Sequence, residues 1–580
     1  MPVLARARGA TRHSGGKGHA RRWAGWAACL GLLAGALVAA SPAGSQTATA
    51  PTPSPPLPSI HSAVTSAPSI DGQPPVSGPL RAPGGPYLME SHGRVVFLHG
   101  VNVVFKHPPY EVYADPGKFW NFTAHDASLM ARLGFNVVRL GMTWSGLEPG
   151  TAPANTPAVC TPGTPSDPGQ FNRSVLNAYL GRLSRTVNLL GSYHIYTILD
   201  MHQDVYNQAF DGEGAPSWAV CTNHVAMTDP PGRWSGEYST TAARVAFGHF
   251  WNNDVRGDLQ GQYDQVWGYV AKAFRGDAWV IGYDPFNEPY STSLVPYRGE
   301  HFDAQLQCFY TGTKYIKIQL TGAPTLHCPR NDPASGVVPT ILANDPSHLV
   351  FDEPDNYGTS GYVTFLGPMR LRNLVYNVHL YCGARSPVTG NPTNVSLCAS
   401  QAARSLGKRH RDRPEMASHT QPGGPAWLVT EFGATSSAAY LASVTALMDD
   451  EQVGWIYWSW KYYGDPTGSA AESLVMSDGR LKATARVLSR TYPEAVAGRP
   501  ISFDYAPGTD VFHLAYTPNH RIQAPTVVFV PTQIHYPRGY CAEVTGGRVT
   551  SAAGSDQLEV TNARTGRLVT VTVEPGACTP

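Results

Sequence analysis

The segment 279–289, which reads WVIGYDPFNEP, carries the two features on which the interpretation of this chain depends. Its first half is a continuous apolar run of strand length, as expected for a strand buried on both faces of a parallel sheet. Its second half ends that strand with three polar residues, Asp284, Asn287 and Glu288, and a proline. The preceding segment, QVWGYVAKAFRG at 265–276, has the apolar spacing of a helix. A helix followed by a buried strand with a polar end is typical of α/β folds.

Seven further runs of the same kind occur along the chain. Together, the eight runs are 95–104, 136–144, 196–202, 279–289, 348–354, 373–381, 426–433 and 453–460. Other helical patterns lie at 125–134, 175–193 and 438–451. Eight strands with helices between them predict an α/β fold of the (β/α)8 TIM-barrel type over 87–493. A doubly wound open sheet is the main alternative, but no GxGxxG motif follows the first run.

The predicted barrel is longer than the usual ~250 residues. The excess lies in three stretches, 145–174, 203–264 and 290–347. Each stretch follows a strand run, so we expect these insertions on the face where barrels place their active sites. After Pro493 the pattern changes to short Val/Thr-rich pieces with alternating polarity, separated by Gly, Pro and Asn. This pattern predicts a small C-terminal antiparallel β-sandwich over 497–580.

The N-terminus has the order of an export signal. Six basic residues precede the apolar run 23–40, and small residues follow it. This order predicts a signal peptide over 1–45 and therefore a secreted, extracellular protein. An uncleaved membrane anchor is the alternative, because 18 apolar residues approach the length of a bilayer span. The next segment, 46–86, is dense in Pro, Ser and Thr and is expected to be an extended linker.

Composition excludes several classes of protein. Of 580 residues 42% are hydrophobic, which excludes a chain that is disordered throughout. The 58 Gly and 50 Pro show no G-X-Y period, which excludes collagen. Without the six N-terminal basic residues the chain has 37 Lys and Arg against 42 Asp and Glu. A mildly acidic mature protein is a poor candidate for binding nucleic acid, which requires clustered basic residues.

Eight of the nine cysteines lie outside the predicted signal, and an even number in an exported chain predicts disulfides. Pairing of neighbours gives 160–221, 308–328, 382–398 and 541–578, although the sequence does not prove this connectivity. No CxxC or Cys/His zinc spacing is present, so we expect no structural zinc.

Two glutamates stand at corresponding places. Glu288 lies in DPFNEP after the fourth run, and Glu431 lies in TEFG at the end of the seventh. In a barrel these strand ends border one cleft. Retaining glycosidases need two carboxyl groups ~5–5.5 Å apart, one as acid/base and one as nucleophile. A single glutamate at a strand end is more often a salt bridge or a cap, but two with matched flanks favour catalysis.

With these motifs the chain resembles glycoside hydrolase clan A, family five. The matching polar residues follow in the expected order along the strand ends and are Arg139, His202, Asn287, Glu288, His379, Tyr381, Glu431 and Trp458. Within the family, the motifs LDMHQDVY and DPFNEP and the C-terminal β-domain are most similar to endoglycoceramidases. Those enzymes cleave the β-glycosidic bond between an oligosaccharide and ceramide, and Lys106 and Asp204 match positions that line their glucose site.

The resemblance implies a role for each of these residues. Glu288 is expected to be the general acid/base and Glu431 the nucleophile. Asn287 is expected to bind the sugar 2-hydroxyl, and Lys106, His202 and Asp204 to bind further hydroxyls. Trp458 is expected to form the apolar floor under the sugar ring. Tyr381 and Arg139 are expected to hold Glu431, and His379 to support Glu288.

Alternatives exist for single residues and for the function. Trp458 can be a core residue, Lys106 a solvated loop residue, and His202 with Asp204 a metal pair, although no third ligand is evident. The leading hypothesis is a secreted, monomeric, retaining endo-β-glycosidase without metal or cofactor that hydrolyses the linkage between the glycan and ceramide of glycosphingolipids. Its expected partners are a glycolipid or oligosaccharide substrate and, transiently, a membrane or micelle surface. The alternatives are a β-glucanase or mannanase with the same chemistry, and a non-catalytic carbohydrate- or lipid-binding protein.

Overall fold

The computed structural model describes residues 76–578 except 77, 162–171, 228–237, 256, 291–297, 314–327, 329, 331, 356–363, 365, 387–388 and 466–468. The predicted signal peptide and most of the predicted linker lie outside these residues. Residues 78–86 differ from the expected linker, because Leu80 and Ala82 are buried and Arg81 pairs with Met89. The Gly and Pro residues on both sides of this short segment gave it the composition of a linker.

Eight parallel strands close into a barrel in the order β10-β3-β4-β5-β6-β7-β8-β9. They are β3 (His99–Val103), β4 (Val137–Met142), β5 (Tyr196–Met201), β6 (Val280–Asp284), β7 (Leu349–Asp352), β8 (Leu374–Leu380), β9 (Ala426–Gly433) and β10 (Trp455–Trp458). Each strand lies within one of the eight predicted runs, so the (β/α)8 barrel is confirmed.

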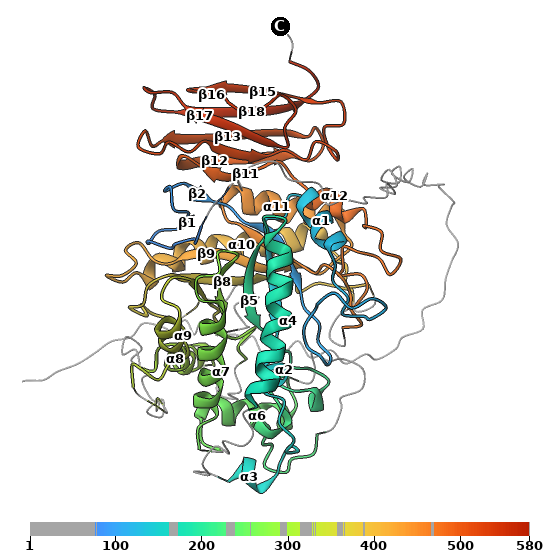
Figure 1. The fold of residues 1–580 in the computed structure, drawn as a ribbon, viewed down its shortest axis with the longest axis vertical. Coiled ribbons are helices and arrows are strands. Elements are labelled where there is room, and N and C mark those ends of the chain that lie inside the picture. The colour runs from blue at the N-terminus through green and yellow to red at the C-terminus, as the bar shows by residue number, and fades with distance from the viewer. Residues whose placement is uncertain are drawn as a thin grey trace, which may run out of the picture. The chain divides into compact units, whose positions relative to one another are not determined.

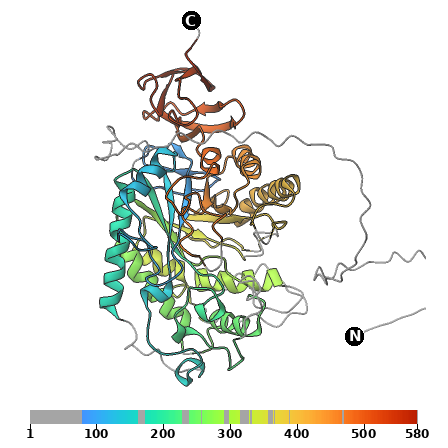
Figure 2. The ribbon, with the colours of Figure 1, turned by 90° about the vertical axis from the view of Figure 1, so that its right-hand side faces the viewer.

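The helices lie around the outside of these strands (Figure 2). They are α1 (Ala124–Arg132), α2 (Trp144–Leu147), α3 (Pro157–Cys160), α4 (Arg173–Gly191), α6 (Thr241–Asn252), α7 (Leu259–Phe274), α8 (Arg298–Thr311), α9 (Val337–Asn344), α10 (Val395–Asp412), α11 (Ala438–Asp450) and α12 (Thr484–Leu488). The four predicted helices correspond to α1, α4, α7 and α11. None of the described helices has the length and apolarity that crossing a bilayer requires.

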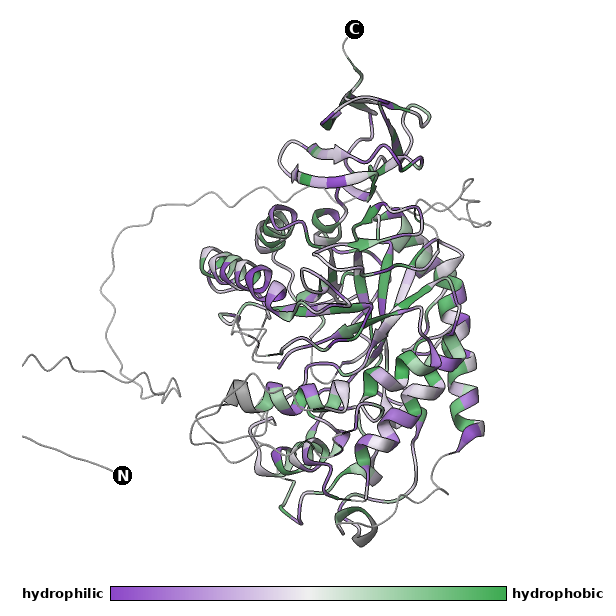
Figure 3. Ribbon diagram, turned by 90° about the vertical axis from the view of Figure 1, so that its left-hand side faces the viewer, coloured by the Kyte–Doolittle hydropathy of each residue, from purple (hydrophilic) through white to green (hydrophobic). Residues whose placement is uncertain are grey.

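The barrel interior changes character along the strands. Near their N-terminal ends, one apolar cluster takes residues from seven of the eight barrel strands, including Ile198, Val375 and Leu428, and it also includes Leu98 just before β3. Two positions further along β5 and β8 the side chains are Asp200 and Asn377, which are also buried. Because alternate strand residues share a face, these polar groups lie directly above the apolar layer. Figure 3 shows the strands largely green, whereas the helices carry both colours.

The C-terminal region forms a sandwich of two antiparallel sheets (Figure 1). One sheet has the order β12-β13-β18-β15, and the other has the order β1-β2-β11-β14-β17-β16. The strands are β1 (Leu88–Met89), β2 (Val95–Val96), β11 (Tyr492–Val496), β12 (Gly498–Ala506), β13 (Val511–Pro518), β14 (Thr526–Phe529), β15 (Tyr540–Thr545), β16 (Gly547–Val549), β17 (Gln557–Asn562) and β18 (Val569–Pro575). The predicted sandwich is therefore confirmed, and it recruits β1 and β2 from the start of the barrel region.

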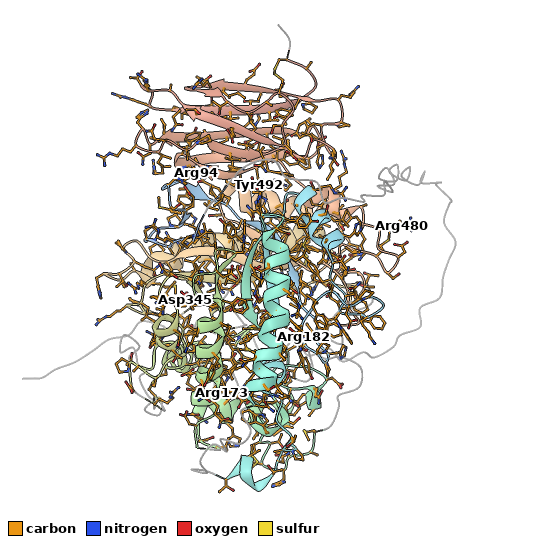
Figure 4. The ribbon with its side chains drawn as sticks, viewed as in Figure 1. Arg94, Arg173, Arg182, Asp345, Arg480 and Tyr492 are labelled. Atoms are coloured by element: carbon orange, nitrogen blue, oxygen red, sulfur yellow. A yellow bond between two sulfur atoms is a disulfide. The ribbon has the colours of Figure 1, made fainter. Side chains whose placement is uncertain are left out.

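Several contacts join the barrel to this sandwich. The phenol of Tyr492 donates to the carbonyl of Gly134 at 2.8 Å, and Arg94 Nη1 donates to the carbonyl of Pro525 at 2.8 Å. Figure 4 labels Tyr492 and Arg94 in this region. The Phe97 ring packs edge-on against Phe503, with ring centroids 4.9 Å apart.

Four disulfides join Cys160–Cys221, Cys308–Cys328, Cys382–Cys398 and Cys541–Cys578. They match the neighbour pairing considered above. Cys160–Cys221 joins two of the long insertions of the barrel to each other, Cys308–Cys328 lies within the third insertion, and Cys541–Cys578 joins β15 to the C-terminal end of the described residues.

Candidate active site

The two predicted catalytic glutamates meet at one histidine. Glu288 follows β6, Glu431 lies on β9, and His379 lies on the intervening strand β8 directly beside Glu431 in the register. The Nδ1 atom of His379 is 2.9 Å from Glu288 Oε1 and 3.4 Å from Glu431 Oε2. Two carboxyl groups 143 positions apart in sequence therefore lie within 3.4 Å of one imidazole nitrogen at the C-terminal mouth of the barrel.

Glu431 is held by two donors. Arg139 Nη1 donates to its Oε1 at 2.6 Å, and the Tyr381 phenol donates to its Oε2 at 2.7 Å. The glycine of the EFG motif has a steric role here. Gly433 has a φ of +92°, and a Cβ at this position would lie 2.5 Å from the Tyr457 ring. Only glycine therefore ends this strand without moving the residues beside the nucleophile position.

Arg139 is completely buried and forms the centre of a polar network below the site. Its guanidinium donates to Glu431 and to four other side chains, which are Asn102 (3.3 Å), Asp200 (2.9 Å), Asp284 (3.0 Å) and Asn287 (2.8 Å). The planar fork of an arginine suits such an arrangement, because it offers five donors in fixed directions. The network fixes the positions of Glu431 on β9 and of Asn287 just after β6, two strands that are separated by β7 and β8.

Glu288 is in an environment that favours its protonated form. Burial raises the pKa of Glu288 to about 7, and the nearby Asp204 carboxylate adds to this increase. Its backbone φ is +42°, in the left-handed region that residues other than glycine rarely adopt. A carboxyl group with a pKa near neutrality can give up and take back a proton during one reaction cycle.

His379 is neutral at this position. Burial lowers the pKa of His379 to about 3, and the Arg139 charge adds to the decrease. A neutral imidazole carries a proton on only one nitrogen, so Nδ1 can donate to one carboxylate oxygen at a time. The ring therefore separates the two glutamates without adding a positive charge between them.

One cavity of about 1010 Å³ brings the remaining predicted residues together. It is lined by all eight predicted catalytic and substrate-binding residues, which are Lys106, His202, Asp204, Asn287, Glu288, Tyr381, Glu431 and Trp458. Arg139 and His379, predicted as supporting residues, lie directly beneath its floor through the contacts described above. No predicted site residue lies elsewhere.

Trp458 presents its ring beside basic side chains. The imidazole of His202 stacks on it with centroids 5.3 Å apart and planes at 15°, and Lys106 Nζ lies 4.6 Å from the ring centre. The indole Nε1 donates to Glu472 Oε2 at 3.2 Å. These contacts fix the orientation of the Trp458 ring, which also lines the cavity.

Lys106 is buried within a group of acids. Its Nζ lies 2.5 Å from Asp204, 3.2 Å from Asp465 and 3.9 Å from Glu213. Burial opposes a charged amine, but these three carboxyl groups raise the pKa of Lys106 well above its usual value. His202, Asp204 and Glu213 are also close enough together to bind a cation. The Lys106 amine already occupies the place of the positive charge among them.

Four contributors to the site were not assigned as catalytic, substrate-binding or supporting residues from the sequence. Glu213 and Asp465 complete the acidic surroundings of Lys106, Glu472 bonds to Trp458, and Glu353 contacts both Glu288 and His379. The first three lie on loops without a recognisable motif. Glu353 directly follows β7, and its place at a strand end was the one available signal.

Comparison with known proteins agrees with this geometry. The family model "Cellulase (glycosyl hydrolase family 5)" matches residues 117–464, and the model "Glycoside hydrolase family 5 C-terminal domain" matches 490–573. The chain is 26% identical over 501 residues to endoglycoceramidase I of Rhodococcus hoagii (strain 103S), covering 85% of this chain and 88% of that protein. It is 27% identical over 482 residues to an endoglycoceramidase of Hydra vulgaris, covering 79% and 81%.

A solved structure has the same fold. Endo-glycoceramidase II from Rhodococcus sp. in complex with ganglioside GM3 aligns with a TM-score of 0.65 at 23% identity, over 85% of this chain and all of that one. The match of a family model to more than half of the chain settles the classification that the motifs indicated. The chain belongs to glycosyl hydrolase family 5 and is a glycoside hydrolase.

Proposed function

We propose that this protein is a retaining endo-β-glycosidase that hydrolyses the bond between the glycan and the ceramide of glycosphingolipids. The observation that carries the chemistry is the shared contact of Glu288 and Glu431 with His379 Nδ1. These two carboxylate oxygens are at most about 6.3 Å apart, below the ~6.5–9.5 Å of inverting enzymes. A separation within this limit favours a retaining mechanism with a covalent intermediate.

In this mechanism Glu431 attacks the anomeric carbon while Glu288 protonates the departing oxygen. The glycosidic bond breaks and a bond from Glu431 to the sugar forms with inverted configuration. Glu288, now a carboxylate, then takes a proton from water, which attacks the same carbon and releases Glu431. Two inversions restore the β configuration. The donors from Arg139 and Tyr381 hold Glu431 in place for attack.

The other cavity residues are assigned to the sugar in the same proposal. Asn287 has a second Nδ2 proton besides the one given to Gln203, and it can donate this proton to the 2-hydroxyl. Lys106, His202 and Asp204 form a charged wall for the more distant hydroxyls. Trp458 supplies an aromatic surface for the C–H face of the ring.

The choice of a glycosphingolipid rests on the relatives. The curated relatives reported above are endoglycoceramidases, and they align over four fifths of their length or more. The cavity of about 1010 Å³ is at the upper end of the range for small-ligand sites, which suits a substrate larger than one sugar. Export and a monomeric state belong to the same proposal, as does transient contact with a membrane or micelle. The basic and apolar N-terminal segment supports export.

A substrate panel tests this function. Purified enzyme is incubated with a ganglioside, lactosylceramide, a soluble β-glucan and a mannan, and the products are separated by thin-layer chromatography. We expect free oligosaccharide and ceramide from the glycolipids and no cleavage of the polysaccharides. The anomer released first, read by NMR, should be β. Cleavage of the glucan or mannan alone would contradict the substrate, and an α product would contradict the mechanism.

A further inference from the structure

Glu353 contacts the acid/base and the histidine that the acid/base shares with Glu431. It directly follows β7 and its side chain is 2% exposed. Its Oε2 accepts the backbone N–H of Glu288 at 2.9 Å. Its Oε1 lies 3.2 Å from Nδ1 of His379, the nitrogen that is 2.9 Å from the Glu288 carboxylate. The Glu353 side chain therefore contacts the main chain of Glu288 directly and contacts the Glu288 side chain indirectly, through His379.

The backbone of Glu353 is itself fixed from outside the barrel. The Tyr310 phenol on α8 donates to the Glu353 carbonyl at 2.8 Å, and the Glu353 N–H donates to the same phenol oxygen at 3.1 Å. Two hydrogen bonds to one rigid ring hold the Glu353 main chain against a helix. The contact to Glu288 is therefore anchored in the scaffold and does not depend on a surface loop.

Glu288 needs this support because of its backbone conformation. A φ of +42° is unfavourable for a residue with a side chain and persists only where neighbours hold it. Its N–H is held by Glu353, and its carbonyl accepts from Gln203 Nε2 at 3.1 Å. The peptide groups on both sides of the Glu288 Cα are thus clamped by side chains from β7 and β5.

We propose that Glu353 is the positioning residue of the acid/base: it fixes Glu288 in its left-handed conformation and holds His379 toward the Glu288 carboxyl group. The inference rests on the acid/base role proposed above for Glu288. It assigns no contact between Glu353 and the substrate.

The electrostatic environment agrees with a neutral positioning group. Burial raises the pKa of Glu353 well above its usual value, and the carboxylates of Asp284 and Glu288 add to this increase, while Arg139 opposes it. This increase favours the protonated form of Glu353. A glutamine at this position would keep both the neutral charge and an oxygen that accepts the Glu288 N–H.

A series of leaving groups separates positioning from general structure. Dinitrophenolate is a good leaving group and departs without protonation, whereas the alkoxide of an alkyl glycoside must be protonated by the acid. Only cleavage of the alkyl glycoside therefore depends on a well-placed Glu288. We compare kcat/KM, which reports formation of the glycosyl-enzyme, for 2,4-dinitrophenyl β-lactoside and octyl β-lactoside. The variants are Glu353→Gln and Glu353→Met, which have similar volume and differ in the accepting oxygen.

For Glu353→Met we expect kcat/KM on the octyl lactoside to fall by about 10–100-fold, with little change on the dinitrophenyl lactoside. Glu353→Gln should retain most activity on both. An equal loss on both substrates, or no loss on either, would overturn the inference. If Glu353→Met does not fold by circular dichroism, Glu353→Ala is measured in its place.

Glu288→Gln serves as the reference for the acid/base role itself. It should lose far more activity on octyl lactoside than on dinitrophenyl lactoside. If Glu288→Gln lacks this dependence, the proposed function of Glu288 fails. If Glu288→Gln shows this leaving-group dependence and Glu353→Met does not, only the role of Glu353 fails.

Discussion

The two ends of the barrel interior are built from the same strands but from opposite kinds of residue. At the N-terminal end, Ile198 and Leu428 belong to a continuous apolar layer. Toward the C-terminal end the same strands carry Asp200 and Glu431, which are buried to a similar degree. Burial alone therefore does not distinguish the two layers; what differs is whether each buried group needs a specific partner.

This difference separates stability from chemistry. An apolar layer gains free energy from any well-packed neighbour, so its members can be exchanged at moderate loss. A buried charge is tolerated only with its partners in place, and removing one partner leaves the others uncompensated. Arg139 holds three carboxylates in this way, so the polar layer behaves as one unit.

The largest expected effect is that of Glu431→Gln on turnover. Loss of the nucleophile should lower kcat on a glycosphingolipid by at least ~10⁴-fold, as for other enzymes that lose an attacking group. The amide keeps the shape of the side chain, so the circular dichroism spectrum should match that of the wild type. Near-wild-type turnover would show that Glu431 is not the nucleophile and that the polar layer does not carry the catalysis.

A matched pair of substitutions tests the comparison of the two layers directly. Arg139→Met leaves buried carboxylates without their positive partner and should lower the free energy of unfolding by about 3–5 kcal/mol. Leu428→Ala in the apolar layer should lower it by a similar ~2–5 kcal/mol. Both are measured by urea unfolding, and turnover is measured on the folded fraction. Arg139→Met should be inactive and Leu428→Ala active; an active Arg139→Met would show that the network does not organise the site.

The pH profile should show the protonation state of Glu288. Because the pKa of Glu288 is raised to about 7, the acid form predominates below that pH and is lost above it. We expect kcat/KM on glycolipid to decline on the alkaline side with a midpoint near pH 7. A dinitrophenyl glycoside should lack this decline, since its leaving group needs no proton. A profile flat to pH 9 on glycolipid would contradict the assignment.

The smallest expected effect is on stability. The pKa of Glu288 is higher in the folded protein than its usual value, so the folded state binds more protons and loses stability as pH rises toward and through 7. Glu288→Gln removes this penalty. Its Tm should therefore exceed that of the wild type at pH 8 and match it more closely at pH 5, as measured by differential scanning calorimetry. An equal difference in Tm between Glu288→Gln and the wild type at pH 5 and pH 8 would contradict the raised pKa of Glu288.

Most of the barrel and the centre of the site could be predicted from the sequence. Parallel strands such as β6 and β9 are continuous apolar runs, and a run that ends in NEP or EFG marks both the strand and its catalytic end. The eight strands and the meeting of Glu288 with Glu431 follow from that coincidence of signals.

The parts that could not be predicted depend on long-range contacts. β1 has only two residues and pairs with β2, whereas β2 lies at the start of the predicted run 95–104 but pairs with β11 from the far end of the chain, which no local pattern shows. Glu213 and Glu472 lie on loops whose path is set by tertiary contacts. Glu353 follows a strand, but nothing in its neighbours shows that its carboxyl group turns toward Glu288.

The sheet that joins β2 to β11 limits the order in which a growing polypeptide can reach its final form. Val96 pairs with Ala495, which the ribosome adds 399 residues later. At ~5–20 residues per second this interval lasts roughly 20–80 s. During that time the strand edge at Val95 and Phe97 lacks its partner strand β11. A product that ends before β11 lacks the strand that pairs with this edge.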